Sequence, residues 1–200
     1  TGVETTRGPI AARKVGLACA GHSSRVAALA GLKLPIESHV LQAFVTEGLK
    51  PLIPGVITFG AGHFYISQSD KGGLVFGGDI DGYNSYAQRG NLANVSEVSQ
   101  ALVSAMPSAA RLRVLRHWGG IMDMTMDGTP IIGRLPLEGL VMNGGWCYGG
   151  FKATPASGWC FAHTIANDAP HTYNAGFTMD RFAQGRYIDE AGTGPYNHLQ

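Results

Sequence analysis

Hydrophobic residues near the start of the chain form one continuous run and one helix-spaced group. Residues 15–19 are an apolar run that stops just before Gly21, and apolar residues recur at helical spacing over residues 26–29. This pattern predicts a strand, a tight turn and a helix that Ser23 or Ser24 caps. Such a turn either serves packing alone or presents free N–H groups to a nucleotide.

The middle of the chain changes to β-branched and aromatic runs. Runs over residues 39–46, 63–68 and 74–76 are divided by glycine and proline, with a turn-forming sequence at residues 70–73. They predict strands of an antiparallel sheet, the last two joined as a hairpin. Apolar residues at helical spacing then predict a helix that opens at Asn94 and stops at Pro107.

The last third of the chain predicts two further strands and one helix. Residues 111–124 read as a long strand, and residues 140–142 as a short buried strand that leads into a glycine-rich turn. Thr154 suits the N-cap and Pro155 the first turn of a helix that runs to about Asn167. From Asp168 onward we expect the chain to wrap the surface.

Composition narrows the class of protein. Of the 200 residues 29 are glycine, about twice the usual ~7%, yet 44% are hydrophobic, enough for a packed core rather than disorder. The formal charge is +1 without long charged runs, so we expect no binding to nucleic acid or to an anionic membrane surface. No membrane span is expected either. Three cysteines without a CxxC pair favour the cytoplasm.

The glycine-rich turn carries the clearest candidate chemistry. Residues 143–155 combine four glycines, three large aromatic residues and Lys152. Free N–H groups at a helix start, with a lysine beside them, suit a phosphate, a carboxylate or the N1/C2=O edge of a reduced flavin. Phe151 and Ala153 interrupt the contiguous Gly-Lys-Thr of a nucleotide-hydrolysing P-loop, which argues against that class. The alternative is a packing turn whose lysine points into water.

Other polar residues give weaker signals. The seven histidines lack metal-ligand spacing, so no metal site is expected, and a GxSxG motif is absent. Residues 116–120 place Arg116, an imidazole, an indole and two glycines just before Asp123 and Asp127. This stretch is either backbone left open to a ligand or an ordinary charged strand end.

Several stretches, taken together, carry a family resemblance. They are TTRG at 5–8, AGHSS at 20–24, QRG at 88–90, LRHWGG at 115–120, TMD at 125–127, PII at 130–132, GGW at 144–146, GGFKATP at 149–155, AHTIA at 162–166 and parts of 180–190. The chain resembles the β subunits of heterotetrameric sarcosine oxidases, within the D-amino-acid-oxidase-like flavoprotein family. The resemblance extends over almost the whole chain.

The resemblance implies a fold and a division into domains. The fold class is α/β with an α+β substrate domain: the C-terminal part of a split Rossmann-type FAD-binding domain, plus a largely antiparallel substrate-domain sheet with flanking helices. Residues 1–34 are then a strand-turn-helix piece of the FAD-binding domain, and residues 35–118 the substrate domain. Residues 119–167 return to the FAD-binding domain, and residues 168–200 form a C-terminal tail.

The resemblance also implies an activity and a set of cofactor residues. Such enzymes oxidise the secondary amine sarcosine (N-methylglycine) to glycine and pass electrons through FAD and a covalently held FMN to oxygen, with other subunits as partners. Positions matching Cys147 and Gly150 contact FAD, and those matching Arg116 and Lys152 contact FMN. In one-flavin relatives the matching lysine holds the substrate carboxylate, so Lys152 is the candidate catalytic residue. The predicted cofactor-binding residues are Gly21, Arg116, Cys147, Gly149, Gly150 and Lys152.

Two departures from the family pattern limit what this chain can do alone. It has no G-x-G-x-x-G with a following acidic residue, and the family's FMN-linking histidine lies upstream of Thr1. The chain is therefore expected to be part of a longer protein, to bind flavin poorly by itself and to favour a homo-oligomer. Two alternatives remain open: a related proline-type amino-acid dehydrogenase, and a non-catalytic remnant.

Overall fold

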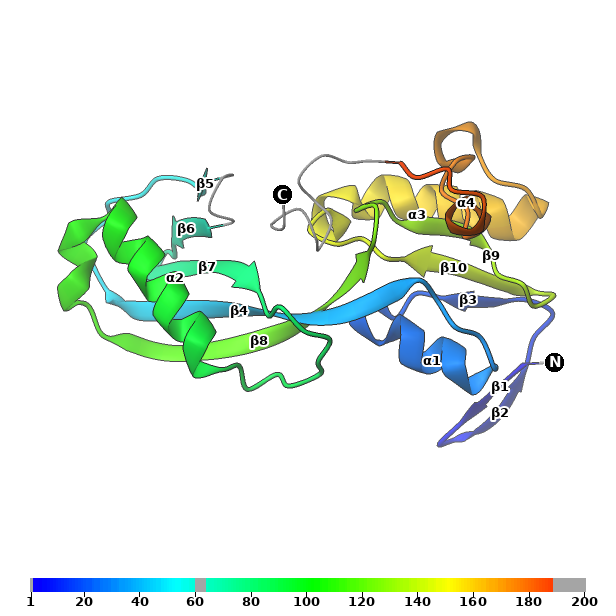
Figure 1. Cartoon of the computed structure of the whole chain (residues 1–200), viewed down its shortest axis with the longest axis horizontal. Helices are drawn as coiled ribbons and strands as arrows, with labels where there is room; N and C mark the ends of the chain where they lie inside the picture. Colours follow the sequence, from blue (N-terminus) through cyan, green and yellow to red (C-terminus); the bar gives the residue numbers. More distant parts are fainter. Residues whose placement is uncertain (1, 60–63, 189–200) are drawn as a thin grey trace. The chain divides into compact units, whose positions relative to one another are not determined.

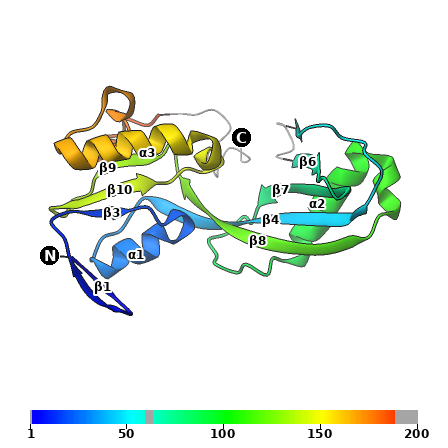
Figure 2. The same cartoon turned by 180° about the vertical axis from the view of Figure 1, so that it is seen from behind.

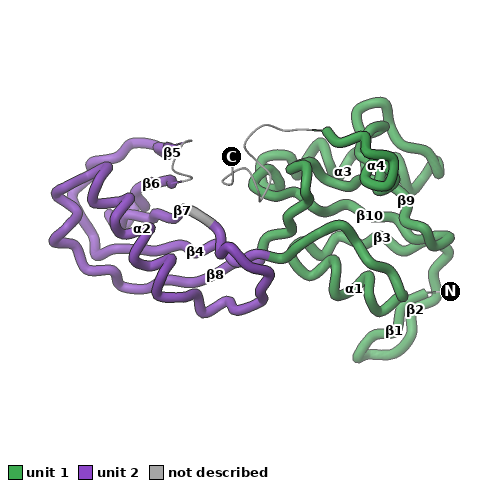
Figure 3. The backbone as a smooth tube through the Cα atoms, in the orientation of Figure 1, with its two compact units in different colours: residues 1–38, 122–200 green, residues 39–121 purple. Residues whose placement is uncertain are grey.

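The structure, a computed structural model, describes residues 2–59 and 64–188 (Figure 1). His63, at the start of a predicted strand, and the end of the predicted tail from residue 189 lie outside the described residues. The chain forms two compact units (Figure 3), one from residues 1–38 and 122–200 and the other from residues 39–121.

The first unit contains a three-stranded sheet between helices. Its order is β3 (Val15–Leu17), β10 (Leu140–Gly144), β9 (Ile131–Arg134), with β3 parallel and β9 antiparallel to β10. Helix α1 (Ser23–Leu29) lies on one side of this sheet and α3 (Gly150–Asn167) on the other, in both views (Figures 1 and 2). The core between sheet and helices consists of Leu17, Ala27, Leu34, Ile36, Ile131, Leu135 and Met142. Parallel strands covered by helices on both faces are the arrangement expected of a Rossmann-type piece.

Smaller elements of the first unit were not predicted. An exposed hairpin pairs β1 (Gly2–Thr5) with β2 (Gly8–Ala11). The C-terminal segment adds η4 (Thr172–Asn174) and α4 (Asp180–Ala183), and it does more than wrap the surface, because Asn174 and Arg181 are buried. These side chains make the segment part of the interior of the unit.

The second unit is built on a five-stranded sheet with flanking helices. The strand order is β5 (Ile57–Phe59), β6 (Phe64–Gln68), β7 (Gly73–Ile80), β4 (Ile36–Gly48), β8 (Val114–Thr125). The pairs β5–β6, β6–β7 and β4–β7 are antiparallel. Helix α2 (Leu92–Ala105) and η3 (Pro107–Arg111) cover the sheet, and the core comprises Phe44, Phe64, Ile66, Leu74, Phe76, Val98, Leu102 and Ala109. The predicted fold class, a helix-covered α/β part and a largely antiparallel sheet, is confirmed.

Local capping explains where the observed elements differ from the predicted ones. Helix α2 begins before Asn94 because the side chain of Asn91 accepts a hydrogen bond from the Asn94 N–H at 2.8 Å. Strand β8 starts later than predicted because residues 107–111 form a 3₁₀ turn. Neither serine caps α1: Ser24 Oγ donates to the Ile36 carbonyl, and the N-cap is His22. No helix in the described ranges is long and apolar enough to cross a membrane.

Candidate functional site

The link between β10 and α3 is a turn whose backbone tolerates few side chains. A Cβ on Gly144 would lie 2.7 Å from Met142 Cε, 3.3 Å from Ser23 Oγ and 3.4 Å from an Asp123 carboxylate oxygen. Gly145 has φ +75°, and Cys147 has φ +50°, in the left-handed region that a non-glycine residue enters at a cost of about 1 kcal/mol or more. The prediction that this turn needs glycine holds at Gly144 and Gly145. The other residue of the turn with a left-handed backbone conformation is Cys147, which is not a glycine.

Asp123, on β8, binds this turn through both its side chain and its backbone. Its carboxylate accepts a hydrogen bond from the Gly145 N–H at 2.5 Å, and its backbone carbonyl accepts one from the Cys147 N–H at 3.0 Å. Burial raises the pKa of Asp123 above its usual value of 3.8, although the backbone hydrogen bonds oppose the rise. A buried carboxyl group with a raised pKa beside a glycine-rich turn is typical of a functional site.

Ser23 Oγ faces the same place and has no partner. The residue is fully buried, and its hydroxyl makes no hydrogen bond to any described residue. A buried hydroxyl without a partner costs about 1–3 kcal/mol. Ser23 Oγ and the carboxylate of Asp123 both lie within hydrogen-bonding reach of the space that a side chain at Gly144 would fill.

Helix α3 begins five residues earlier than predicted. It starts at Gly150, with Gly149 as the N-cap, so the interpretation of Thr154 as the cap and Pro155 as the first helical residue is wrong. Thr154 Oγ1 instead donates to the Gly150 carbonyl at 3.0 Å, and Pro155 lies inside the helix. The first N–H groups, those of residues 150–152, have no intrahelical acceptor, and the glycine cap has no side chain to serve them.

Lys152 adds a full charge at this helix start. Its side chain is exposed, and Nζ donates to the Tyr148 carbonyl at 3.3 Å, so the ammonium group folds back over the turn. The three N–H groups and the ammonium group together favour an anion.

Trp146 forms one side of the turn. Its indole N–H donates to Asn143 Oδ1 at 2.7 Å, which fixes the ring. A Cβ on Gly150 would lie 3.1 Å from Trp146 Cβ, which is tighter than most Cβ contacts, so a side chain at this position would require Trp146 to shift slightly. The Gly149 N–H donates to the Trp146 carbonyl at 2.8 Å, which closes the turn.

The predicted site residues fall into two groups. Cys147, Gly149, Gly150 and Lys152 share one turn and helix start. Gly21 belongs to the same unit: it is buried in the 3₁₀ turn before α1, and its carbonyl accepts from Ser38 Oγ at 2.7 Å.

Arg116 lies in the other unit, exposed on β8. Of the two glycines that follow it, Gly119 makes room for packing rather than for a ligand, because a Cβ there would meet Val40 at 2.6 Å. Gly120 has open space around it. The structure thus supports the first group as one site and leaves Arg116 as a separate prediction.

Metal chemistry has no support in the described part of the chain. No group of three or more histidine, cysteine or acidic side chains is placed there to hold a metal ion.

A family model described as FAD dependent oxidoreductase matches residues 1–164. The chain belongs to this oxidoreductase family.

Two similar curated relatives of this chain are each called sarcosine oxidase subunit beta. The one from Rhizobium meliloti (strain 1021) is 67% identical over 99% of this chain and 48% of the relative, and the one from Arthrobacter sp is 52% identical over 99% and 49%. The predicted resemblance is confirmed, and the chain spans about half the length of these relatives.

Solved structures of FAD-dependent oxidoreductase type share the fold. L-proline dehydrogenase from P. horikoshii superposes with a TM-score of 0.82 at 30% identity, covering 94% of this chain and 51% of that one. Glycine oxidase from Geobacillus kaustophilus gives 0.77 at 22% identity, covering 89% and 48%, a likeness of fold.

The residues of the turn fit one part of an FAD molecule. The uncapped helix start at Gly150, with its free N–H groups and the Lys152 ammonium group, suits the partly anionic edge of a flat ring. The space beside Gly144 is not part of this contact, because Met142 Cε, Ser23 Oγ and an Asp123 carboxylate oxygen already fill it. The family membership supports FAD as the cofactor. The part of the site that holds the ADP moiety is not among these residues, because the chain lacks the G-x-G-x-x-G sequence.

Proposed function

We propose that this chain supplies part of a flavin-dependent amine oxidase that demethylates sarcosine to glycine. The observation that supports this most strongly is the 67% identity to a sarcosine oxidase subunit beta over 99% of the chain. The glycine-rich turn with its uncapped helix start is the candidate contact with FAD.

Bound FAD would supply the acceptor for the hydride that leaves the carbon next to the amine nitrogen. The N–H groups of residues 150–152 and the Lys152 ammonium group would hold the negatively charged edge of the flavin ring, because the helix start places them together before any ligand binds. Lys152 is accordingly the proposed catalytic residue, with Gly21, Cys147, Gly149 and Gly150 as backbone contacts.

FMN and partner subunits complete the proposal. In the proposed assembly Arg116 and Lys152 contact FMN, whose covalent attachment residue lies outside this chain, and other subunits contribute to both sites. FMN and the substrate carboxylate are the alternatives to the FAD ring edge as the group that Lys152 contacts. The three cysteines are free, which supports the cytoplasm as the compartment.

A proline-type dehydrogenase is the second candidate function. It is supported by the likeness to L-proline dehydrogenase, with a TM-score of 0.82 and 30% identity. Such an enzyme passes electrons to a carrier rather than to oxygen.

The test uses the full-length protein purified with its partner subunits. Sarcosine and L-proline are each supplied with oxygen or with an artificial electron acceptor. Oxygen consumption with sarcosine, with glycine as product, is the expected result. Oxidation of L-proline with the artificial electron acceptor but not with oxygen would favour the dehydrogenase. No oxidation of either amine would favour a non-catalytic remnant.

A further inference from the structure

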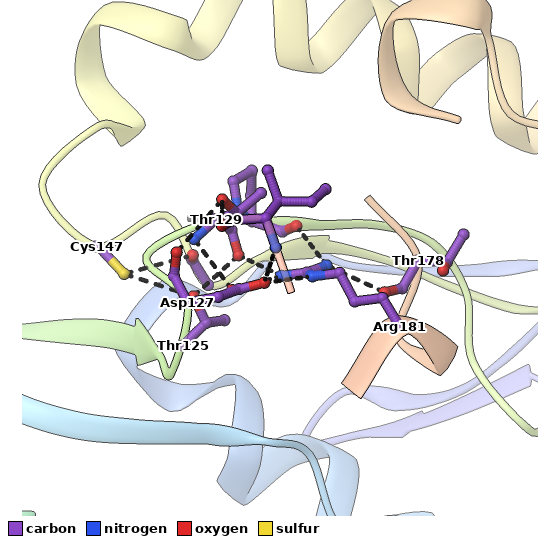
Figure 4. A network of polar contacts seen from close by, with 9 residues as sticks. Thr125, Asp127, Thr129, Cys147, Thr178 and Arg181 are labelled. Carbon is purple, nitrogen blue, oxygen red and sulfur yellow. Dashed lines mark hydrogen bonds and ion pairs between the residues drawn. The ribbon is translucent and has the colours of Figure 1, made fainter. Parts of the chain in front are cut away.

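A buried ion pair joins the C-terminal segment to the loop that follows β8. Arg181 is 2% exposed, and its guanidinium group forms a two-pronged contact with Asp127: Nε to Oδ2 at 2.7 Å and Nη2 to Oδ1 at 2.9 Å (Figure 4). Nη1 donates to the carbonyls of Pro130 and Thr178, each at 3.0 Å. The guanidinium group therefore fixes the loop and the segment before α4 together.

The two members of the ion pair fix the backbone of Thr129 through its N–H and its carbonyl. Its N–H donates to Asp127 Oδ1 at 3.2 Å, and its carbonyl accepts from Arg181 Nη2 at 2.6 Å. The same carbonyl accepts a second hydrogen bond, from Thr125 Oγ1 at 2.9 Å. The position of the Thr125 hydroxyl thus depends on a carbonyl that the ion pair holds in place.

The Thr125 hydroxyl in turn contacts the glycine-rich turn. Its oxygen lies 3.6 Å from Cys147 Sγ (Figure 4). The Thr125 hydroxyl proton is directed at the Thr129 carbonyl, and the thiol has both Thr125 Oγ1 and the Gly145 carbonyl, 3.7 Å away, as acceptors for its single proton. The Thr125 methyl group supports the turn as well, because Cγ2 lies 2.6 Å from where a Cβ on Gly145 would be.

Cys147 needs such support because its backbone is strained. It is a non-glycine residue at φ +50°, and it is buried. A conformation of this kind persists where the surroundings determine it more strongly than local preference does. The surroundings are the Asp123 carbonyl, which accepts from the Cys147 N–H, and Thr125, which contacts its sulfur.

We propose that Arg181, Asp127 and Thr129 are positioning residues that act through Thr125 to hold Cys147 and its turn in the observed conformation. That this turn faces FAD rests on the proposed function. The consequence is that the C-terminal segment, distant in sequence, determines how firmly the cofactor contact is held. Thr125 is the member whose side chain contacts Cys147, and its hydroxyl can be removed while the ion pair stays intact.

The test measures how often the turn opens. In the assembled full-length protein, the buried Cys147 is alkylated with iodoacetamide under native conditions. Trypsin then releases residues 135–152, a peptide with Cys147 as its single cysteine, for mass spectrometry. Thr125→Val should speed alkylation about three- to tenfold, the effect expected from losing one hydrogen bond that holds the closed turn. Arg181→Met should speed it by more, because it removes the buried ion pair and all the hydrogen bonds of the guanidinium group. Thr125→Ser, which keeps the hydroxyl but loses the methyl group, should be alkylated more slowly than Thr125→Val.

A matched control separates positioning from general destabilisation. Leu102→Ala removes core volume in the second unit without touching the network. If this variant, or Thr125→Ser, exposes Cys147 as much as Thr125→Val does, the positioning proposal is overturned. The visible spectrum of the bound flavin is recorded in the same samples. Faster alkylation with an unchanged spectrum would support positioning while contradicting the placement of the turn against FAD.

Discussion

The side chain of Asp123 accepts the N–H of Gly145 at 2.5 Å, across 22 residues of sequence. The same residue binds the Cys147 N–H through its backbone carbonyl. A single position on β8 therefore fixes both residues of the turn that have left-handed backbone angles. Hydrogen bonds to strand β8 therefore stabilise the turn, in addition to the backbone conformations that its glycines allow.

Replacing Asp123 by Asn should change how stability depends on pH. Because burial raises the pKa of Asp123 above 3.8, the folded protein keeps a proton that the unfolded chain releases, and wild-type stability falls as pH rises through that window. Asp123→Asn keeps an oxygen that accepts from Gly145 but cannot ionise. Its stability relative to wild type should therefore rise with pH through the window. Urea unfolding from pH 3 to 8 measures this.

A control for that experiment is Asp70→Asn, in the exposed hairpin turn. It should leave the pH dependence as in wild type. Equal pH dependence of Asp123→Asn and wild type would contradict the raised pKa.

A substitution at Gly144 tests whether the turn depends on having glycine at this closely packed position. Gly144→Ala places a methyl group 2.7 Å from Met142 Cε and should cost about 1–3 kcal/mol in the free energy of unfolding. Gly158→Ala is the matched control, since nothing lies within 4 Å of its Cβ position and it sits inside α3. That change should be neutral or stabilise the protein by up to about 1 kcal/mol. Similar stabilities of the two variants would show that the space at Gly144 is not needed.

Sequence patterns predicted the longer strands and most helices because hydrophobic spacing reports burial directly, but they missed the short strands β1, β2, β5 and β9. They misplaced the start of α3, since Thr154–Pro155 has the composition of a helix start while the glycine Gly149 is the actual cap. They gave no sign that Arg181 would pair with Asp127, because a contact between residues 54 positions apart depends on tertiary packing. Asp123 was noted in sequence, but its role needed the strand and the turn together.

The Asp127–Arg181 pair should make the protein sensitive to acid. Burial alone would raise the pKa of Asp127, but hydrogen bonds and charge from Arg181, with the Ile188 and Thr129 N–H groups, lower it below 3.8. The stabilisation is therefore complete above pH 3.8 and is lost as pH falls through the lowered pKa. Asp127→Asn should cost about 3–5 kcal/mol at neutral pH, and the difference from wild type should shrink in acid.

Asp168→Asn provides the comparison for the buried pair. Lys14 lowers the pKa of Asp168 through a hydrogen bond, but this pair is exposed. Its loss should have little effect on unfolding at any pH. A loss as large as that of Asp127→Asn would contradict the importance of burial.

The 200-residue chain expressed alone should bind little flavin. It supplies a turn and a helix start for the ring but lacks the sequence that holds the ADP moiety. Absorbance of the purified chain after incubation with FAD measures the occupancy, with the full-length protein as the reference. A yellow chain with near-stoichiometric FAD would contradict this expectation.

The most direct measurement is stopped-flow kinetics of the flavin in the assembled full-length protein, with sarcosine and then with oxygen. Lys152→Met removes the exposed ammonium group at the start of α3, and Lys71→Met, in the hairpin turn of the other unit, is the matched control. Lys152→Met should slow flavin reduction or its reoxidation about tenfold to a hundredfold, with unfolding unchanged, while Lys71→Met keeps wild-type rates. Wild-type rates of both steps in Lys152→Met would contradict the assignment of this turn and its lysine to the flavin site.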